Sequence, residues 1–352
     1  MASSPIFLPR LARSAIVVLA LTAFGLSGAA AASAAPGMVG IGNQQANMFT
    51  APLFEQLHVP ISRLVVSYDA VLGHTAEVTS VDAWVRGAAA DGVAPLISFN
   101  HHRGCYDTRG HGSIPRRPSC RLPTVAAYQR AFAAFRHRYP MIRAYSPWNE
   151  ANHRSQPTYD NPRRAAQFYN VVRRACPACE VVAADVLDQD GVGGWLKRFE
   201  RYAQGSPRIW GLHNYEDVNH HTTSRTRAVL AVVRGQVWLT ETGGIVKFPH
   251  LPFSPRRAAG ATRFMFQLAA LSSRITRLYI YQWSGARPGE RFDAGLTGPH
   301  GAPRPAYFVV RRHLRLTPSR SAPPPAQSPA GPAPSAGGPS PPSGSPAPAS
   351  GP

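Results

Sequence analysis

The feature that most constrains the fold is a regular alternation of apolar, strand-like runs with amphipathic, helix-like runs through the middle of the chain. The strand candidates are rich in Val, Ile, Leu and aromatic residues with few polar interruptions, which is expected when both faces of a sheet are covered. Alternation of this kind predicts a parallel sheet with right-handed crossovers. The eight candidates are Met38–Gly42, Arg63–Tyr68, Ala94–Phe99, Ile142–Trp148, Val181–Asp185, Ile209–Asn214, Gln236–Thr240 and Leu278–Trp283.

A helical segment follows each strand candidate; these segments are Pro52–His58, Val81–Ala90, Val125–Arg138, Arg163–Cys176, Gly194–Ala203, Thr223–Val233, Arg256–Ser273 and Ala306–His313. Eight strand–helix units in one domain-sized chain predict an α/β fold, the closed (β/α)8 or TIM barrel. An open doubly wound sheet is the alternative. It is disfavoured because the glycines Gly40 and Gly42 lack the third glycine of a dinucleotide-binding loop. Pro147 falls inside the fourth candidate and cannot donate a ladder hydrogen bond, so we expect a bulge there.

The two ends of the chain differ in composition from the middle. Residues 1–34 have the features of a secretory signal, with Arg10 and Arg13 before the apolar run Ser14–Gly28 and an A-x-A cleavage site at Ala32-Ser33-Ala34. An uncleaved anchor is the alternative. Residues 317–352 are mostly Pro, Ser, Ala and Gly, and we expect a disordered tail because little apolar surface offsets its ordering entropy. The folded domain would span 35–316, and the protein would be secreted, extracellular or cell-wall associated, with no stable membrane insertion after cleavage.

The formal net charge of +20 is carried almost entirely by arginine, since Lys197 and Lys247 are the only lysines. A nucleic-acid surface would need basic clusters with interleaved aromatic residues. The arginines are instead scattered, so we expect no nucleic-acid partner. Attraction to an anionic cell wall or an acidic glycan is compatible with this charge.

The four cysteines allow three pairings. A secreted protein favours disulfides, and pairing between sequence neighbours predicts Cys105–Cys120 and Cys176–Cys179. Redox chemistry at the Cys176-Pro-Ala-Cys179 motif is disfavoured, because a reactive motif of this type begins a helix and Cys176 ends one.

Polar and aromatic residues gather at the ends of the strand candidates. In a barrel of this class the active site lies at the carboxyl ends of the strands, so these side chains should meet. Carboxylates at the ends of the fourth and seventh strands would face each other across the barrel mouth. His101 and His102 lack further metal ligands at suitable spacing, so we expect neither a metal nor a cofactor. The candidates, in chain order, are Arg63, Asn100, His101, Asn149, Glu150, His213, Tyr215, Glu241 and Trp283.

Two short motifs carry a resemblance to a known group of enzymes. Tyr145-Ser146-Pro147-Trp148-Asn149-Glu150-Ala151-Asn152 and Trp238-Leu239-Thr240-Glu241-Thr242-Gly243 resemble the fourth- and seventh-strand signatures of the clan A glycoside hydrolases. The W-N-E-x-N form is most similar to the β-xylosidase and iduronidase branch. The sequence departs from the common pattern at Ala151, where many members have proline, and in the spacing of His213 and Tyr215.

The resemblance implies a role for each matching residue. Glu150 would be the acid/base and Glu241 the nucleophile. Asn149 would bond the sugar 2-hydroxyl, Tyr215 and Arg63 would hold the nucleophile, and Trp283 would be the platform under the reacting sugar. Each role has a structural alternative: a helix-start carboxylate for Glu150, a solvated loop residue for Glu241, core aromatics for Tyr215 and Trp283, and an ion pair for Arg63.

The expected function is therefore retaining hydrolysis of an O-glycosidic bond in a poly- or oligosaccharide by double displacement. Two alternatives stay open: a catalytically silent barrel that binds cell-wall polysaccharide, and a transglycosylase with the same site. The sequence carries no pattern that identifies the sugar or its linkage.

Overall fold

A computed structural model describes residues 37–73, 75–102, 105 and 120–316. The predicted signal (1–34) and tail (317–352) lie outside the described residues. Within the described part of the chain, no helix is both long enough and apolar enough to cross a bilayer.

The described residues contain one sheet in which every paired strand is parallel to its neighbour. Its order is β5-β4-β3-β2-β1-β9-β8-β7-β6. The strands are β1 (Met38–Gly42), β2 (Ile61–Ser67), β3 (Ala94–Asn100), β4 (Ala144–Ser146), β5 (Glu180–Val181), β6 (Asp185–Leu187), β7 (Ile209–His213), β8 (Gln236–Thr242) and β9 (Ile275–Tyr281).

The two strands at the ends of this order, β5 and β6, are separated by only three residues of chain. Backbone bonds continue across that gap: Val182 N donates to Tyr145 O of β4 (2.9 Å), and Ala183 N donates to Ile209 O of β7 (2.8 Å). The segment 180–187 therefore acts as one interrupted strand that joins the two ends of the sheet. The result is eight strand positions around a closed ring, as the TIM barrel requires.

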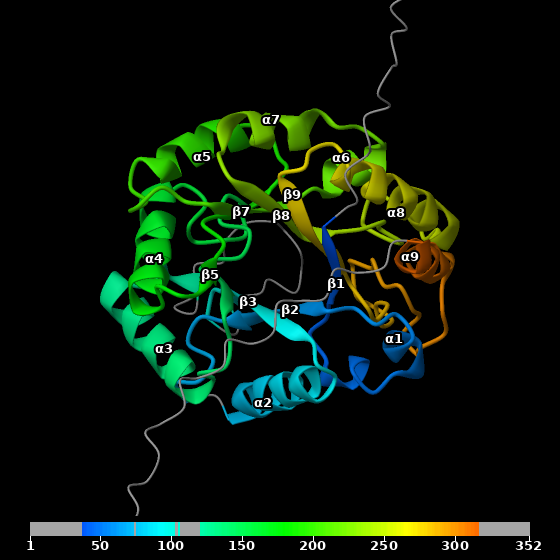
Figure 1. The fold of residues 1–352 in the computed structure, drawn as a ribbon, viewed down its shortest axis with the longest axis horizontal. Coiled ribbons are helices and arrows are strands. Elements are labelled where there is room, and N and C mark those ends of the chain that lie inside the picture. Colours follow the sequence, from blue (N-terminus) through cyan, green and yellow to red (C-terminus); the bar gives the residue numbers. More distant parts are fainter. Residues whose placement is uncertain (1–36, 74, 103–104, 106–119, 317–352) are drawn as a thin grey trace, which may run out of the picture. The chain divides into compact units, whose positions relative to one another are not determined.

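Helices surround the ring of strands (Figure 1). Their bounds are η1 (a 3-10 turn, Ala46–Met48), α1 (Pro52–Glu55), α2 (Thr75–Ala90), α3 (Val125–Arg138), α4 (Pro162–Ala175), α5 (Val192–Glu200), α6 (Tyr215–His220), α7 (Ser224–Val232), α8 (Pro255–Ala269) and α9 (Pro305–Leu316). Buried aromatic residues fill the layer between α3 and the strands, where Phe99 of β3 lies edge-on to Phe132 and Phe135 of α3.

Local sequence signals explain where the helices begin and end. The side chain of Asn161 accepts a hydrogen bond from Arg164 N at the start of α4, and Pro162 occupies the first turn. Arg173 and Arg174 lie in its last turn, where positive charge is favourable to the helix dipole. Thr124 caps α3 in the same way through Ala127 N.

The structure corrects three sequence predictions about elements. Pro147 does not sit within a strand, because β4 ends at Ser146 and the Pro147 carbonyl accepts from the Tyr128 hydroxyl (2.7 Å). The fifth strand is two short pieces rather than one. Helix α6 was not predicted, and it begins directly after β7.

Candidate active site

Glu150 lies in the turn after β4, held by backbone bonds on both sides. Asn149 N donates to Phe99 O of β3 (2.7 Å), and Ala151 N donates to Asp185 O of β6 (2.8 Å). Glu150 itself has φ +47°, a left-handed conformation that costs a non-glycine residue of the order of 1–3 kcal/mol and often occurs at functional sites. The turn therefore aims one carboxylate from between two neighbouring strands.

Glu241 lies in β8 and is held by two donors. Arg63 Nη1 lies 2.5 Å from Oε1, and the Tyr215 hydroxyl donates to Oε2 (3.2 Å). Burial, then the charge of Glu241, raises the pKa of Tyr215 well above its usual value of 10, so the phenol keeps the proton that it donates. The pairing of β7 with β8 shifts register between Gly211 and His213, and the shift places His213 beside Glu241.

His213 lies between the two glutamates and is fully buried. Its Nδ1 is 3.3 Å from Glu150 Oε1 and 3.7 Å from Glu241 Oε2, while its Nε2 is 3.2 Å from Asp185 Oδ1. Burial alone lowers the pKa of His213, but the charges of Glu241 and Asp185 and the bonds to Asp185 and Glu150 outweigh it and raise that pKa to about 10. The ring is therefore a cation at neutral pH.

The same cation controls Glu150. Burial raises the pKa of Glu150, but the hydrogen bond and charge of His213, with smaller effects from His153 and Arg63, hold it below its usual range. The Glu150 side chain is 22% exposed and that of Glu241 9%, so both can be reached from the chamber. One oxygen of Glu150 and one of Glu241 lie within 4.8 Å of each other. The two carboxylates therefore face one another at the same end of the barrel.

Asp185 is a buried carboxylate that the sequence analysis did not single out. It bonds Arg63 Nη2 (2.9 Å) in addition to His213, and its side chain is not exposed to solvent. Burial raises its pKa, but the charges of His213 and Arg63 outweigh that and hold the pKa far below the usual value. A lone aspartate at the end of an apolar run gave no sign of this position.

A chamber of about 510 Å3 contains both glutamates. Its wall combines polar groups with aromatic rings, an arrangement that suits a sugar, whose CH faces stack on rings while its hydroxyls need hydrogen bonds. Phe292 is at the centre of the aromatic part, in contact with Tyr215, Phe248 and Tyr281. The chamber is lined by Gln44, Val65, Asn149, Glu150, His153, Leu187, Asp188, Gln189, Tyr215, Glu216, Asn219, His220, Glu241, Ile245, Phe248, His250, Leu251, Tyr281 and Phe292.

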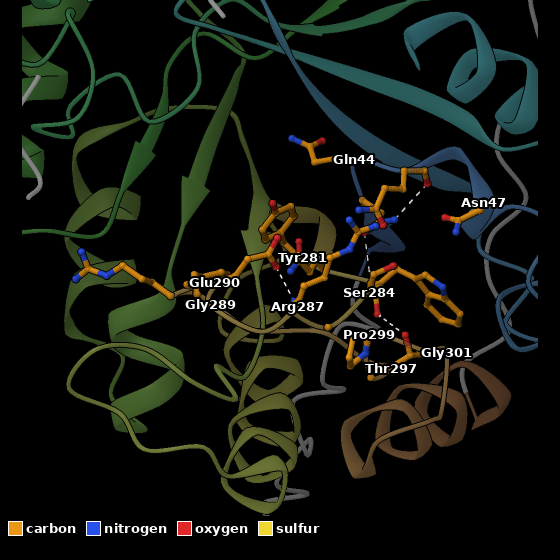
Figure 2. A pocket seen from close by; sticks show the side chains of 18 of the residues that line it. Gln44, Asn47, Tyr281, Ser284, Arg287, Gly289, Glu290, Thr297, Pro299 and Gly301 are labelled. Carbon is orange, nitrogen blue, oxygen red and sulfur yellow. Dashed lines mark hydrogen bonds between the residues drawn. The ribbon is translucent and has the colours of Figure 1, made fainter. Parts of the chain in front are cut away.

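A larger cavity of about 1170 Å3 adjoins the chamber. The two share five lining residues: Gln44, His153, Phe248, Tyr281 and Phe292. In Figure 2, Tyr281 lies near Glu290, with Gln44 at one edge of the cavity and the segment of Thr297, Pro299 and Gly301 at the opposite edge. Tyr281 therefore borders both spaces.

Some predicted site residues lie outside the chamber. Trp283 is 4% exposed and packs edge-on against Phe54 and Tyr307, so it belongs to the core and reaches only the larger cavity. The platform role of Trp283 stays a prediction, but β9 ends at Tyr281 and it is Tyr281, not Trp283, that lines the chamber.

Asn100 and His101 also lie beside the chamber rather than in it. Both border a smaller neighbouring cavity, and His101 borders the larger one as well. Asn149 does line the chamber, and its side-chain oxygen accepts from Arg63 Nη2 (2.6 Å). Arg63, His213, Tyr215 and the two glutamates come together as one constellation.

The spacing of Glu150, His213 and Glu241 is also short enough for a cation. A cation there would have to displace a proton from His213, because a metal ligand must be a neutral imidazole and the raised pKa of His213 favours the protonated ring. Arg63 already supplies a positive charge in contact with Glu241.

Both predicted disulfides, Cys105–Cys120 and Cys176–Cys179, are present. Cys105 borders the larger cavity, so the first disulfide lies beside the site. The second joins the residue after α4 to the residue before β5, and neither of its cysteines lines the chamber.

No family model matches the sequence, and no curated protein matches it. Solved structures share the fold. A family 39 glycoside hydrolase from Bacteroides cellulosilyticus has a TM-score of 0.53 and 15% identity over 81% of this chain and 65% of its own, so this chain spans less than two thirds of its length. Xylanase 10B from Thermotoga maritima has a TM-score of 0.56 and 12% identity over 80% of this chain and 95% of its own.

The GH39 enzyme from Xanthomonas axonopodis pv. citri has a TM-score of 0.58 and 14% identity over 81% of this chain and 68% of its own. These structural neighbours are clan A glycoside hydrolases, the group whose motifs the sequence resembles. At such identities the likeness establishes the barrel fold.

Proposed function

We propose that this chain is a secreted glycoside hydrolase that cleaves an O-glycosidic bond with retention of configuration. The observation that carries the proposal is the approach of Glu150 and Glu241 to within 4.8 Å across one chamber. Retaining enzymes place their carboxyl groups about 5–5.5 Å apart, whereas inverting enzymes need roughly 6.5–9.5 Å to admit a water. The two disulfides are compatible with an oxidising compartment outside the cell.

In the first step Glu241 attacks the anomeric carbon and the glycosidic bond breaks. Arg63 and Tyr215 hold its two oxygens, so the attacking group is already oriented. Glu150 gives its proton to the departing oxygen. In the second step Glu150 takes a proton from water, the water oxygen bonds to the anomeric carbon, and Glu241 leaves as a carboxylate.

The charge of His213 determines when Glu150 can act as the acid. A second carboxylate nearby ordinarily raises the pKa of an acid, but His213 lies between Glu150 and Glu241 and holds the pKa of Glu150 low. The protonated form needed for the first step is therefore favoured at acidic pH. The pH dependence of kcat/KM reports the protonation states of the free enzyme. We therefore expect kcat/KM to fall as the pH rises within the acidic range, where Glu150 loses its proton.

The chamber wall indicates a class of substrate. Among the described residues, no arginine or lysine lines this chamber, while Glu150, Asp188, Glu216 and Glu241 do. The cations next to the glutamates, Arg63 and His213, are already paired with carboxylates, so an acidic sugar at the cleavage point would find no cation that is not already neutralised. We therefore favour a neutral glycan, with Tyr281 and Phe292 stacking on the ring and the Asn149 amide group donating to a hydroxyl.

The test begins with a panel of aryl glycosides and of plant and bacterial wall polysaccharides, and then compares two variants. Glu241→Ala should lower kcat on the order of 10⁴-fold or more, and azide should restore activity and give a glycosyl azide of inverted configuration. Glu150→Ala should retain the first step for substrates with good leaving groups, and azide should give a product of retained configuration. The exposed Glu55 of α1 offers a control, since Glu55→Ala changes no chamber residue.

If the two azide products show the opposite configurations, Glu150 is the nucleophile and Glu241 is the acid/base. Little loss of activity in either variant would show that they are not the catalytic pair. A wild type that binds polysaccharide but hydrolyses no glycoside would favour the silent binding barrel. Transfer of the sugar to an acceptor other than water would identify a transglycosylase.

A further inference from the structure

We propose that Asp185 is the positioning residue of this site: it holds His213 and Arg63 from the far side, so that His213 presents its other nitrogen to both glutamates and Arg63 presents its other terminal nitrogen to Glu241. The inference rests on the proposed function, because it concerns the same pair of carboxylates. Asp185 acts through its two cationic partners and is not itself proposed to touch the glycan.

The contacts of His213 fix the state of its ring. Nε2 faces Asp185 Oδ1 at 3.2 Å, and Nδ1 faces Glu150 Oε1 at 3.3 Å and Glu241 Oε2 at 3.7 Å. Ionised carboxylates only accept hydrogen bonds, so both ring nitrogens must carry a proton. A neutral imidazole would leave one carboxylate contact without a donor. The negative charge of Asp185 thus favours the doubly protonated imidazole of His213 over the neutral one.

The contacts of Arg63 follow the same logic. Its Nη2 donates to Asp185 Oδ2 (2.9 Å) and its Nη1 lies 2.5 Å from Glu241 Oε1. The guanidinium is planar and rigid, so fixing one nitrogen fixes the direction of the other. Asp185 therefore orients the donor that holds the proposed nucleophile.

Asp185 is itself held in place by hydroxyl groups from three other strands. Ser98 of β3 and Ser146 of β4 donate to Oδ2 at 3.0 and 2.9 Å, and Thr240 of β8 donates to Oδ1. With Arg63 of β2 and His213 of β7, one carboxylate joins five strands to β6. Buried polar groups so fully bonded are rigid, which suits a group that must set geometry.

Several charged groups face His213, and all of them enter the test. Arg63 approaches from β2 at 3.4 Å from Nε2, Glu150 from the turn after β4, Asp185 from β6 and Glu241 from β8. Asp185→Asn removes one negative charge and keeps nearly the same volume. Three charged groups then remain around the ring: the Arg63 cation and the carboxylates of Glu150 and Glu241. The ring nitrogen Nε2 no longer faces an anion.

The experiment follows the His213 ring by NMR in protein labelled on its histidine rings, with the signals assigned by their loss in His213→Gln. In the wild type both ring nitrogens should stay protonated through pH 8. In Asp185→Asn the ring should lose a proton below pH 8. The same variant should lose about 100-fold in kcat with a change in KM of less than about threefold, because the pair is displaced while the chamber wall is kept.

Asp293→Asn is the matched control, since Asp293 is also buried and paired with an arginine, Arg304, but faces no histidine of the site. It should destabilise the fold and leave His213 protonated. A His213 that stays protonated in Asp185→Asn, or is neutral at pH 7 in the wild type, overturns the inference. The wild-type titration needs no variant to fold. If the ring behaves as expected and the wild type hydrolyses no glycoside, the proposed function fails while the role of Asp185 on the pair stands.

Discussion

At the scale of single residues, the site is an arrangement of three carboxylates around two cations. Glu241, Glu150 and Asp185 would repel one another if they stood alone in a buried place. Arg63 contacts Asp185 and Glu241, and His213 contacts all three. Burial lowers the pKa of Arg63, but the charges of Glu241 and Asp185 outweigh it and raise that pKa further above its usual value. The cations thus allow the two glutamates to approach each other closely in a buried place.

The aromatic residues at the end of β9 should separate into one that binds substrate and one that supports the fold. Tyr281→Ala removes a ring from the chamber wall, so KM should rise by about 5- to 30-fold, corresponding to about 1–2 kcal/mol of lost stacking. Trp283→Ala removes a core side chain, so the free energy of unfolding should fall by about 3–5 kcal/mol. Steady-state kinetics and urea denaturation of both variants measure the two effects.

Trp283→Phe serves as the control, since it keeps an aromatic ring against Phe54 and Tyr307 and should recover part of the stability. The reverse pattern, with KM raised by Trp283→Ala and unchanged by Tyr281→Ala, would return the platform role to Trp283. That pattern would also mean that the chamber extends further under substrate than the structure shows.

Sequence patterns identified the residues of the site whose chemistry is visible at a strand end. Glu150, Glu241 and Tyr215 were predicted together, because polar residues at the ends of parallel barrel strands meet at one mouth. Arg63 begins its strand candidate, and its role was implied by the family resemblance. Asp185 was missed since an aspartate that ends an apolar run is indistinguishable from a strand terminus. Its role depends on partners from five other strands, and a single sequence does not reveal such long-range contacts.

At the scale of elements, periodicity predicted the strands and helices better than their ends. The predicted bounds of β1 and α3 agree with the structure, and at α3 the start is marked by a clear N-cap, Thr124. The strand prediction that differs most in its effect on the site is β9. Its end was predicted at Trp283, two residues later than the observed end at Tyr281. Helix α6 was missed because it is only six residues long and begins directly after the strand candidate Ile209–Asn214.

Helix α6 shows why a short element can matter to the site. It carries Tyr215, whose hydroxyl reaches Glu241, and Asp188 accepts from the backbone N–H groups of Glu216 (3.2 Å) and Asp217 (2.9 Å) in its first turn. Asn219 of the same helix donates to Gly243 O and accepts from Ile245 N in the loop after β8. The helix thus ties the loops of two neighbouring strands around the proposed nucleophile.

The two disulfides should differ in their contribution to stability. Cys105 and Cys120 are 15 positions apart and Cys176 and Cys179 only three. In the chain-entropy account a cross-link stabilises by restricting the unfolded chain, by about 3 kcal/mol for the longer loop and roughly half of that for the shorter one. Serine replacement of each pair, followed by denaturation, should therefore show the larger loss for Cys105–Cys120. Equal losses would show that native contacts, not loop length, decide the effect.

At the scale of the whole molecule, positive and negative charge are separated. Helices α3, α4, α8 and α9 contain arginines and no acidic residue, whereas four acidic side chains line the chamber. Among the described residues, these helical arginines lie outside the chamber, whose wall carries acidic groups instead. An anionic polymer would be attracted to the outer helices, and a neutral glycan would enter the chamber without electrostatic cost.

Two buried groups hold protons more tightly in the folded barrel than they would in the unfolded chain. The pKa of His213 is raised from 6.5 to about 10, and that of Asp188 from 3.8 to about 7, because burial of Asp188 outweighs the backbone hydrogen bonds that it accepts. A group whose pKa is higher in the folded protein than in the unfolded chain contributes to the free energy of unfolding. That contribution is complete below the pKa of the unfolded chain and is lost as the pH rises to the pKa of the folded protein. Both groups therefore favour the fold at acidic pH, Asp188 below about 7 and His213 below about 10.

The barrel should consequently become less stable as the pH rises from 6.5 to 8.5. One proton held only by the folded state changes the free energy of unfolding by about 1.4 kcal/mol per pH unit, so His213 alone should account for about 2–3 kcal/mol over this range. Urea denaturation at pH 5.5, 6.5, 7.5 and 8.5 measures the slope. In His213→Gln the free energy of unfolding should fall less steeply with pH above pH 6.5, by the amount that corresponds to about one proton. Below pH 6.5, where Asp188 titrates, the pH dependence should be unchanged. Equal slopes above pH 6.5 in the two proteins would mean that His213 is neutral in the folded barrel, and the account of how the glutamate pair is held together would then be wrong.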